Sequence, residues 1–259
     1  MNEAKQTRLE DTHPFRFNCY PGVSCFTLCC RDITIVLTPY DVLRLKNGLG
    51  ISSGEFLDKF TIIIPKKGHL IPLVILKMRD NDKRCPFVSK EGCNVYRDRP
   101  WPCRMYPLNL NDDGTYSLIT EASRCLGLNE KDTNRISEWL ERQDIEPYDE
   151  MNEYLTSLTT QLQSQKLDIE NPQIQQMTVM ALYNLDKFRE FVFKSTFLDR
   201  LEVEPEIIEK IRKSDVELLK FAFEWLKFGL FGKKVIWVKA RQDSKIHRGP
   251  DKESKDKAP

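Results

Sequence analysis

Eight cysteines carry the chemistry that this sequence offers, and all of them lie within its first 125 residues. The segment Cys25-x3-Cys29-Cys30 places three thiols within six residues, and Cys19 lies just upstream. Residues 126–259 contain no cysteine. Such segregation favours a shared local purpose over the filling of a core by scattered cysteines. The eight are Cys19, Cys25, Cys29, Cys30, Cys85, Cys93, Cys103 and Cys125.

Three interpretations compete with metal binding for these cysteines. Free cysteine often fills a core as a small hydrophobe, but residues 83–86 and 91–94 are polar and turn-rich. A disulfide framework needs an oxidising compartment and is typical of shorter, secreted chains. A thiol redox relay would use the Cys29-Cys30 pair, yet the chain lacks the Cys-x-x-Cys spacing of thioredoxin. Metal ligation is therefore the favoured interpretation.

The spacing predicts a metal site whose ligands are thiolates alone. It is neither the paired Cys-x2-Cys of a zinc ribbon nor a Cys2His2 finger, and His13, His69 and His247 lie outside ligand-like spacing. Soft thiolates select zinc or an iron–sulfur cluster over magnesium, calcium or manganese. Two sets of four cysteines, one from each half of the cysteine-bearing segment, would converge on one centre or build two.

The adjacent pair Cys29-Cys30 bears on the type of metal centre. Neighbouring side chains in an extended segment point to opposite faces, so these two thiols do not easily bind one ion together. They suit a multinuclear cluster, two nearby metals, or one ligand with a spare thiol. This favours an iron–sulfur cluster as the cofactor, with zinc as the alternative.

Three stretches of the chain together resemble the YkgJ-type cysteine-cluster family, a zinc- or iron-chelating domain. The resemblance covers residues 15–130, and its combination of motifs is specific. It implies a metal held by the six cysteines in these stretches, with Cys19 and Cys125 as flanking members. The stretches are Cys25-Phe-Thr-Leu-Cys29-Cys30, then Arg84-Cys85-Pro86-Phe87, then residues 92–107, which include Cys93 and Cys103.

A second resemblance leads to an alternative function. The lead-in Phe17-Asn18-Cys19 is similar to the start of flagellin lysine N-methylase, which carries a comparable cluster. This resemblance implies an enzyme that modifies protein lysines. The chain has no recognisable S-adenosylmethionine loop, which favours a binding, redox, structural or metal-handling role instead.

Two arginines flank Cys103 in a proline-rich run. Prolines fix φ, so this loop would hold Cys103 in position before a metal binds. Arg99 and Arg104 would donate hydrogen bonds to ligand sulfurs or offset thiolate charge. The alternative is that both lie on the surface or pair with carboxylates.

Composition narrows the choice of partners and compartment. The chain has 40 Lys+Arg against 39 Asp+Glu, so it lacks the basic excess that nucleic-acid binding requires. It contains no run of about 18 apolar residues, so no membrane span is expected. The first residues lack the apolar core of a secretory signal, and we expect a cytoplasmic protein.

The pattern predicts an α+β fold. We expect a flexible lead at 1–14, a cysteine-cluster domain at 15–130, a helical domain at 134–232 and a disordered charged tail at 239–259. In the cysteine-cluster domain, Thr38, Pro39 and Asp41 predict a capped helix start. Strands are expected at 33–37 and 116–120, a short helix at 53–57, and a hairpin formed by 60–64 and 70–78.

Helical periodicity begins near residue 134 and continues to Phe231. Pro147 is expected to end the first helix, and Asn171 to cap a long helix that reaches Phe193. Further helices are expected at 149–166, from Pro205, and at 216–231 with Asp215 as cap and Gly232 as stop. The last helix is apolar nearly all round. This favours a buried core helix, and the other interpretation is a surface for a protein partner.

Overall fold

The computed structural model describes residues 8–164, 171–232 and 239–240 and has an α+β fold. The α-helices are α1 Pro39–Leu49, α2 Ser53–Phe60, α3 Trp101–Met105, α4 Ile136–Arg142, α5 Glu146–Ser164, α6 Pro172–Leu182, α7 Leu185–Lys194, α8 Pro205–Lys213 and α9 Asp215–Phe231. The 3-10 turns are η1 Leu28–Cys30, η2 Tyr96–Asp98, η3 Leu126–Asn129 and η4 Leu198–Arg200. The strands are β1 Pro14–Arg16, β2 Thr61–Ile64, β3 Leu73–Leu76, β4 Leu108–Leu110, β5 Tyr116–Leu118, β6 Thr133–Arg135, β7 Leu201–Glu202 and β8 Lys239–Ala240.

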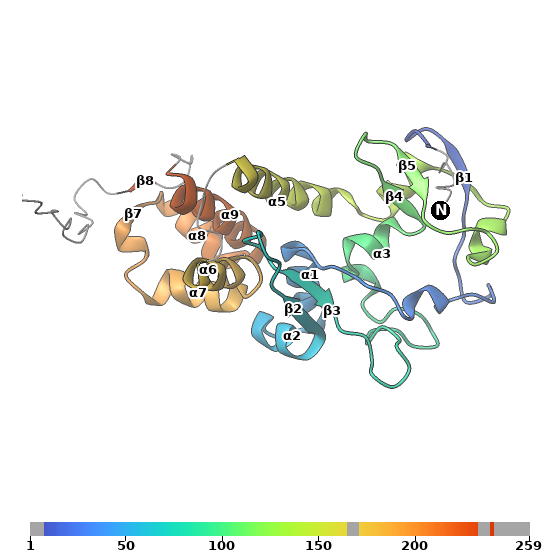
Figure 1. The fold of residues 1–259 in the computed structure, drawn as a ribbon, viewed down its shortest axis with the longest axis horizontal. Helices are drawn as coiled ribbons and strands as arrows, with labels where there is room; N and C mark the ends of the chain where they lie inside the picture. Colours follow the sequence, from blue (N-terminus) through green and yellow to red (C-terminus); the bar gives the residue numbers. More distant parts are fainter. Residues whose placement is uncertain (1–7, 165–170, 233–238, 241–259) are drawn as a thin grey trace, which may run out of the picture.

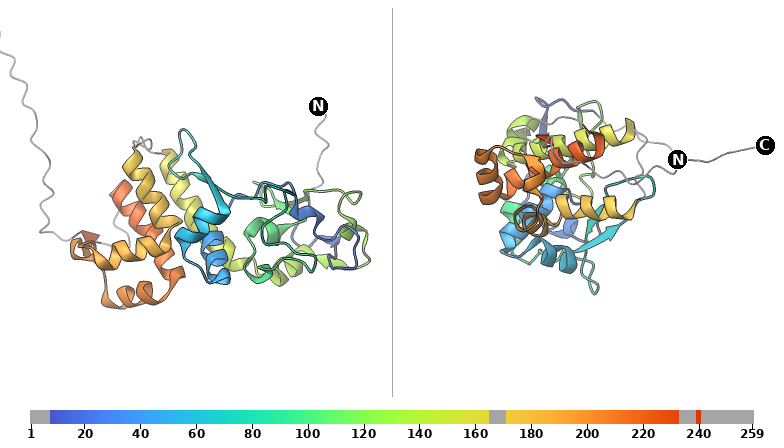
Figure 2. Two further views of the ribbon diagram at one scale, coloured as in Figure 1. Left: turned by 90° about the horizontal axis from the view of Figure 1, so that it is seen from below. Right: turned by 90° about the vertical axis from the view of Figure 1, so that its left-hand side faces the viewer.

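The carboxyl-terminal helices and the strands β1, β4 and β5 lie toward opposite ends of an elongated molecule. Helices α6–α9 gather at one end, and β1, β4 and β5 lie at the other (Figure 1). Helices α1 and α2 and the β2–β3 hairpin lie between them. A view turned by 90° shows the same arrangement (Figure 2). The loop-rich end contains all the cysteines, so the metal-binding question concerns this end alone.

Helix α1 begins as the sequence predicts. The Thr38 side chain accepts a hydrogen bond from the Asp41 N–H, and the Asp41 carboxylate accepts one from the Thr38 N–H, which completes a capping box. The helix ends at Gly50, whose φ of 66° is the left-handed conformation that glycine adopts without strain. The cap matters for the site because Asp41 also contacts the segment that carries Cys103.

The strands pair in small antiparallel sheets of two. The predicted hairpin is confirmed as β2 and β3, and the predicted strand near residue 116 is confirmed as β5, which pairs with β4. Residues 33–37 run beside β3 but form only an isolated bridge, between Val36 and Ile75. The Leu37 N–H still donates to the Val74 carbonyl at 2.7 Å, so this segment is attached to the hairpin.

Two helix boundaries differ from the prediction. The long helix expected from Asn171 to Phe193 is two helices, because the Asn184 side chain accepts the Lys187 N–H and restarts the chain as α7. Pro147 lies in the first turn of α5 and does not end the helix before it. Proline is tolerated there because the first N–H groups of a helix have no intrahelical partner. The caps at Asn171 and Gly232 are confirmed, but Ser214 caps α9 in place of Asp215.

One apolar core joins the two predicted domains. Helix α1 packs against α5 and α9, and α2 packs against α7, so the helices of the amino-terminal half share a core with the carboxyl-terminal helices. About half of the apolar residues of α9 are buried in this core and the others are partly buried against it, as the core-helix interpretation expects. A second, smaller core lies under the cysteine-bearing loops. It contains Leu9, Phe15, Phe17, Met105, Leu108, Cys125, Ile136, Trp139, Leu140 and Ile145.

Residues at the chain ends bear on the predicted lead and tail. Residues 1–7 and 241–259 lie outside the described part of the chain. Residues 8–14, expected to belong to a flexible lead, are instead attached to the fold. Leu9 pairs with Tyr116 and is only 6% exposed, because its side chain joins the smaller core. Within the described residues, no helix has the length and apolar character needed to cross a membrane.

Candidate metal centre

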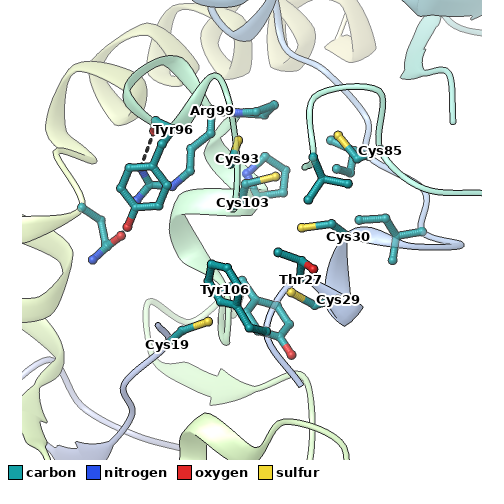
Figure 3. A pocket seen from close by; sticks show the side chains of 18 of the residues that line it. Cys19, Thr27, Cys29, Cys30, Cys85, Cys93, Tyr96, Arg99, Cys103 and Tyr106 are labelled. Atoms are coloured by element: carbon teal, nitrogen blue, oxygen red, sulfur yellow. Dashed lines mark hydrogen bonds between the residues drawn. The ribbon is translucent and has the colours of Figure 1, made fainter. Parts of the chain in front are cut away.

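A cavity of about 810 Å³ opens among the loops that carry the cysteines. Six of the eight cysteines line it (Figure 3). The remaining two, Cys25 and Cys125, are not on its wall, and Cys125 is only 5% exposed. The lining cysteines are Cys19, Cys29, Cys30, Cys85, Cys93 and Cys103.

Four of these thiols form what we call the inner group, comprising Cys30, Cys85, Cys93 and Cys103. The Cys85 N–H donates to the Cys30 carbonyl at 2.8 Å, which places these two segments side by side. Cys93 follows within a tight turn, because the strand-like bridge between Val88 and Cys93 folds the chain back on itself. Cys103 lies on α3, and Figure 3 shows all four sulfurs around one side of the cavity.

The other four form what we call the outer group, comprising Cys19, Cys25, Cys29 and Cys125. The Leu126 N–H, next to Cys125, donates to the Cys25 sulfur at 3.3 Å. The thiols of this group are also close enough for their charges to interact. Burial first, and then the charges of Cys29, Cys125 and Cys25, raise the pKa of Cys19 to about 11. This grouping mixes the two halves of the cysteine-bearing segment, because Cys125 joins the early cysteines and Cys30 joins the later ones.

The adjacent thiols Cys29 and Cys30 lie where the two groups meet. A hydrogen bond from Cys30 lowers the pKa of the Cys29 thiol to about 7. The same hydrogen bond, followed by burial, raises the pKa of Cys30. One thiol of the pair is thus readily ionised while its neighbour holds the proton.

Backbone N–H groups donate to two sulfurs of the inner group, those of Cys85 and Cys93. Burial raises the pKa of Cys85, while the N–H groups of Phe87 and Val88 donate to its sulfur and act in the opposite direction. Burial raises the pKa of Cys93 in the same way, and the Val95 N–H opposes it. Hydrogen bonds to sulfur favour the thiolate, which is the form that binds metals.

Arg99 and Arg104 are both buried, at 7% and 2% exposure, and neither is a surface residue. The Arg99 guanidinium donates to the Tyr96 carbonyl at 2.6 Å, and its charge opposes the burial that raises the pKa of Cys93 and Cys103. The charge of Arg99 therefore favours the thiolate forms of Cys93 and Cys103, and its role beside a bound metal stays a prediction.

Arg104 acts on the backbone and not on sulfur. Its guanidinium donates to the carbonyls of Arg97, Arg99 and Gln143. It therefore fastens the loop before Cys103 to the segment between α4 and α5, and its closest carboxylate, Asp144, is 3.9 Å away. The role of this arginine is to position the loop.

Sequence reasoning missed three residues that position the site. Arg79 donates to the carbonyls of Pro86 and Val88 in the loop that follows Cys85. Asp41 accepts the Trp101 N–H at 2.8 Å at the start of α3. The Tyr106 hydroxyl is hydrogen-bonded to Cys125, and its ring lies between Cys19 and Cys29 in Figure 3. Of these three, only Tyr106 could have been predicted from its neighbours in sequence, because it follows Cys103 by one helical turn.

The donor set fits a thiophilic metal. All eight cysteines are free thiols, so no disulfide framework forms. Within the described residues, no three His, Cys, Asp or Glu side chains are already arranged to hold a metal ion. Three features of the site therefore suit a thiophilic metal: the thiol donors, the N–H groups that donate to sulfur, and the cavity. A metal would draw the sulfurs inward.

Comparisons with known proteins agree with this donor chemistry. Residues 18–126 match a family model named CxxCxxCC, described as a "putative zinc- or iron-chelating domain". The match includes all eight cysteines and confirms the resemblance to the YkgJ-type cysteine-cluster family. Searches of curated proteins and of solved structures returned no match. The similarity to flagellin lysine N-methylase therefore gains no support.

Proposed function

From the match of residues 18–126 to a zinc- or iron-chelating family, we propose that this chain is an iron–sulfur protein whose cavity encloses the cluster. Zinc bound by the same thiols is the alternative. The ligands in the cavity are the inner group, Cys30, Cys85, Cys93 and Cys103. When bound, a cluster would supply one-electron transfer, whereas a zinc ion would act as a structural cross-link.

The spread of the inner group around a cavity carries this proposal. In a tetrahedral zinc site each sulfur is about 2.3 Å from the ion, so the four sulfurs lie roughly 3.8 Å apart. A cluster contains several irons and bridging sulfides and therefore needs a wider ring of thiolates. The cavity of about 810 Å³, which is lined by all four cysteines of the inner group, has room for such a cluster.

The surroundings of the cavity support a thiolate centre. Four thiolates bring four negative charges, and their burial must be offset by hydrogen bonds or positive charge. The N–H groups of Phe87, Val88 and Val95 and the guanidinium of Arg99 supply both. The walls also include apolar side chains such as Phe26 and Phe87, which limit the access of water to a cluster.

Free thiols also bear on the compartment. Cysteines in this number remain reduced where glutathione and thioredoxin act, as in the cytoplasm. We therefore propose a cytoplasmic protein.

The test is anaerobic purification of the full chain, followed by an absorbance spectrum and by analysis of iron, acid-labile sulfide and zinc. The proposal expects a broad band near about 400 nm with iron and sulfide in similar amounts. Cys93→Ser removes one ligand of the inner group and should abolish the band. Asn94→Ala changes the exposed neighbouring side chain and should leave it intact.

Two results would contradict the proposal. A colourless protein with stoichiometric zinc would overturn the cluster and leave zinc as the resident metal. A protein with neither iron nor zinc after anaerobic purification would overturn metal binding as a whole.

A further inference from the structure

Strand β2 has one edge that no described strand covers. It pairs with β3 on one side, and residues 33–37 lie on the far side of β3. Within the part of the chain that the structure describes, neither a strand nor an isolated bridge pairs with the other edge of β2. β2 is therefore the outer strand of this layer, which lies between the two ends of the molecule (Figure 1).

The register of the hairpin shows which backbone groups of β2 face its open edge. The Leu37 N–H donates to the Val74 carbonyl, so Val74 directs its backbone groups away from β2. Ile63 lies opposite Val74, and such a pair in an antiparallel ladder exchanges no hydrogen bonds. The N–H and carbonyl of Ile63 therefore face outward. The Thr61 carbonyl faces the same way, whereas the Thr61 N–H donates to the Leu57 carbonyl at the end of α2.

Apolar side chains lie exposed beside this edge. Ile62 and Ile64 are 49% and 44% exposed, because they lie on the face of the hairpin that points away from the core. Ile62 pairs with Ile75, and Ile75 also bridges to Val36, which is 41% exposed and continues the same face. A further strand along β2 would extend this face and bury part of it through cross-strand contacts.

Lysines lie at both ends of the open edge. Lys66 and Lys67 are exposed in the turn that follows β2, and Lys59 and Lys77 are exposed at the opposite end. Lys59 pairs with Glu55, but among the described residues no carboxylate forms an ion pair with either lysine of the turn. The edge is therefore complementary to a strand that carries acidic residues at its ends.

A second copy of this chain does not complement the edge. Antiparallel pairing of two copies about Ile63 would place Lys67 opposite Lys59 of the second copy, and like charges repel there. The open edge also has more acceptors than donors, because the Thr61 N–H is already used and Pro65 has none. Two such edges would leave carbonyls without donors, whereas an unrelated segment supplies an N–H at every residue other than proline.

We propose that β2 binds an extended segment of another protein as an added strand, with alternating apolar residues between acidic ends. N–H groups of that segment would donate to the carbonyls of Thr61 and Ile63, and one of its carbonyls would accept the Ile63 N–H. Its apolar side chains would cover Ile62 and Ile64, and its acidic ends would lie beside the lysines. This inference does not depend on the metal centre.

The test measures binding of a labelled synthetic peptide to the full chain by fluorescence anisotropy. The peptide has an alternating valine–threonine core with two glutamates at each end, and a second peptide carries lysines in place of the glutamates. We expect the acidic peptide to bind, more weakly as salt is added, and the basic peptide not to bind. Saturation with the acidic peptide should slow hydrogen exchange of the Ile63 N–H, followed by NMR.

Matched variants locate the binding site. Ile63→Pro removes the outward N–H but no hydrogen bond to β3, and it should weaken binding about tenfold. Ile63→Val keeps the N–H and is its control. Lys67→Glu should weaken binding about threefold, whereas Lys187→Glu makes the same change of charge at an exposed position of α7 and should have no effect.

Four results would overturn the proposal. Two are equal affinities of Ile63→Pro and Ile63→Val, and equal binding of the acidic and basic peptides. A third is the absence of binding at millimolar peptide. If Ile63→Pro does not fold, the exchange measurement replaces it, and an unchanged rate at Ile63 on saturation would overturn the edge as the binding site. The fourth is a dimer of the wild type that Ile63→Pro abolishes, since this would identify a second copy as the occupant.

Discussion

The carboxylate of Asp41 accepts the backbone N–H of Trp101 at 2.8 Å and thereby joins the cap of α1 to the helix that carries Cys103. The same carboxylate accepts the Thr38 N–H at 2.8 Å. This carboxylate is fully buried, and burial raises its pKa to about 6. The hydrogen bonds from the N–H groups and the charge of Arg104 act in the opposite direction and lower the pKa. One side chain therefore connects the helical core to the segment that carries Cys103.

Replacement of Asp41 should weaken the fold and the inner group together. Asp41→Ala removes two acceptors from buried N–H groups, and we expect a loss of about 2–4 kcal/mol in the free energy of unfolding. Asp41→Asn keeps one acceptor and should lose less. Urea unfolding measures the loss, and Asp58→Ala, at an exposed position of α2, is the control. Equal stability of Asp41→Ala and the control would contradict this role.

Arg104 should not tolerate lysine. Its guanidinium reaches three carbonyls on two segments, and a single ammonium cannot replace this fork. We expect Arg104→Lys to lower the free energy of unfolding by about 2–3 kcal/mol, because buried carbonyls lose their donors. Arg97→Lys makes the same substitution at an exposed side chain and should be nearly neutral. Thermal unfolding of the two variants in parallel measures the difference in stability. Equal melting temperatures would contradict the role of Arg104 in joining the two segments.

Local signals predicted much of the fold but not the arrangement of the site. The capping box at Thr38, the β2–β3 hairpin and the stop at Gly232 depend on neighbours in sequence, and all three are confirmed. The end of one helix and the start of the next at Asn184 were not predicted, because the apolar helical periodicity continues across this residue and a single capping asparagine is a weak signal.

The grouping of the cysteines depends on contacts between distant segments. Cys125 joins Cys19 through the Asn18–Gly127 pairing, which no spacing rule contains. Arg104 could be identified as a residue of interest, but its target at Gln143 lies on another segment and was not predictable. Thus the sequence predicts which side chains are candidate ligands, whereas the grouping of the thiols follows only from the fold.

Gly127→Ala should force apart the two segments that pair at Asn18 and Gly127. The added Cβ would meet a backbone oxygen at 2.5 Å, and a backbone atom cannot turn away as a flexible side chain can. We expect a loss of about 1–3 kcal/mol in the free energy of unfolding. Gly229→Ala is the matched control, because a Cβ at that position in α9 meets nothing within 4 Å. Urea unfolding of both variants measures the loss. A free energy of unfolding in Gly127→Ala no lower than in the control would contradict the close approach as a requirement of the fold.

Lys46 should make the helical core sensitive to acid. Its ammonium is only 6% exposed and lies 2.8 Å from Asp215 and 3.5 Å from Asp186. Burial opposes the ionisation of Asp215, but the hydrogen bond and charge of Lys46, together with hydrogen bonds from Arg189 and Asn47, outweigh it and lower the pKa of this carboxyl below its usual range. A lowered pKa in the folded state contributes stability at neutral pH, and that stability is lost as the pH falls below about 4.

Lys46→Met should therefore reduce stability at pH 7 by about 1–3 kcal/mol, because Asp215 keeps Arg189 but loses its buried partner. The variant should lose less further stability than the wild type when the pH falls from 5 to 3, since the Lys46 contribution is already gone. Urea unfolding at several pH values measures both effects. Lys59→Met is the control, because its pair with Glu55 is exposed and contributes only about 0.3–0.5 kcal/mol. If the stability of Lys46→Met ran parallel to that of the wild type at every pH, Lys46 would not be the group that lowers the pKa of Asp215.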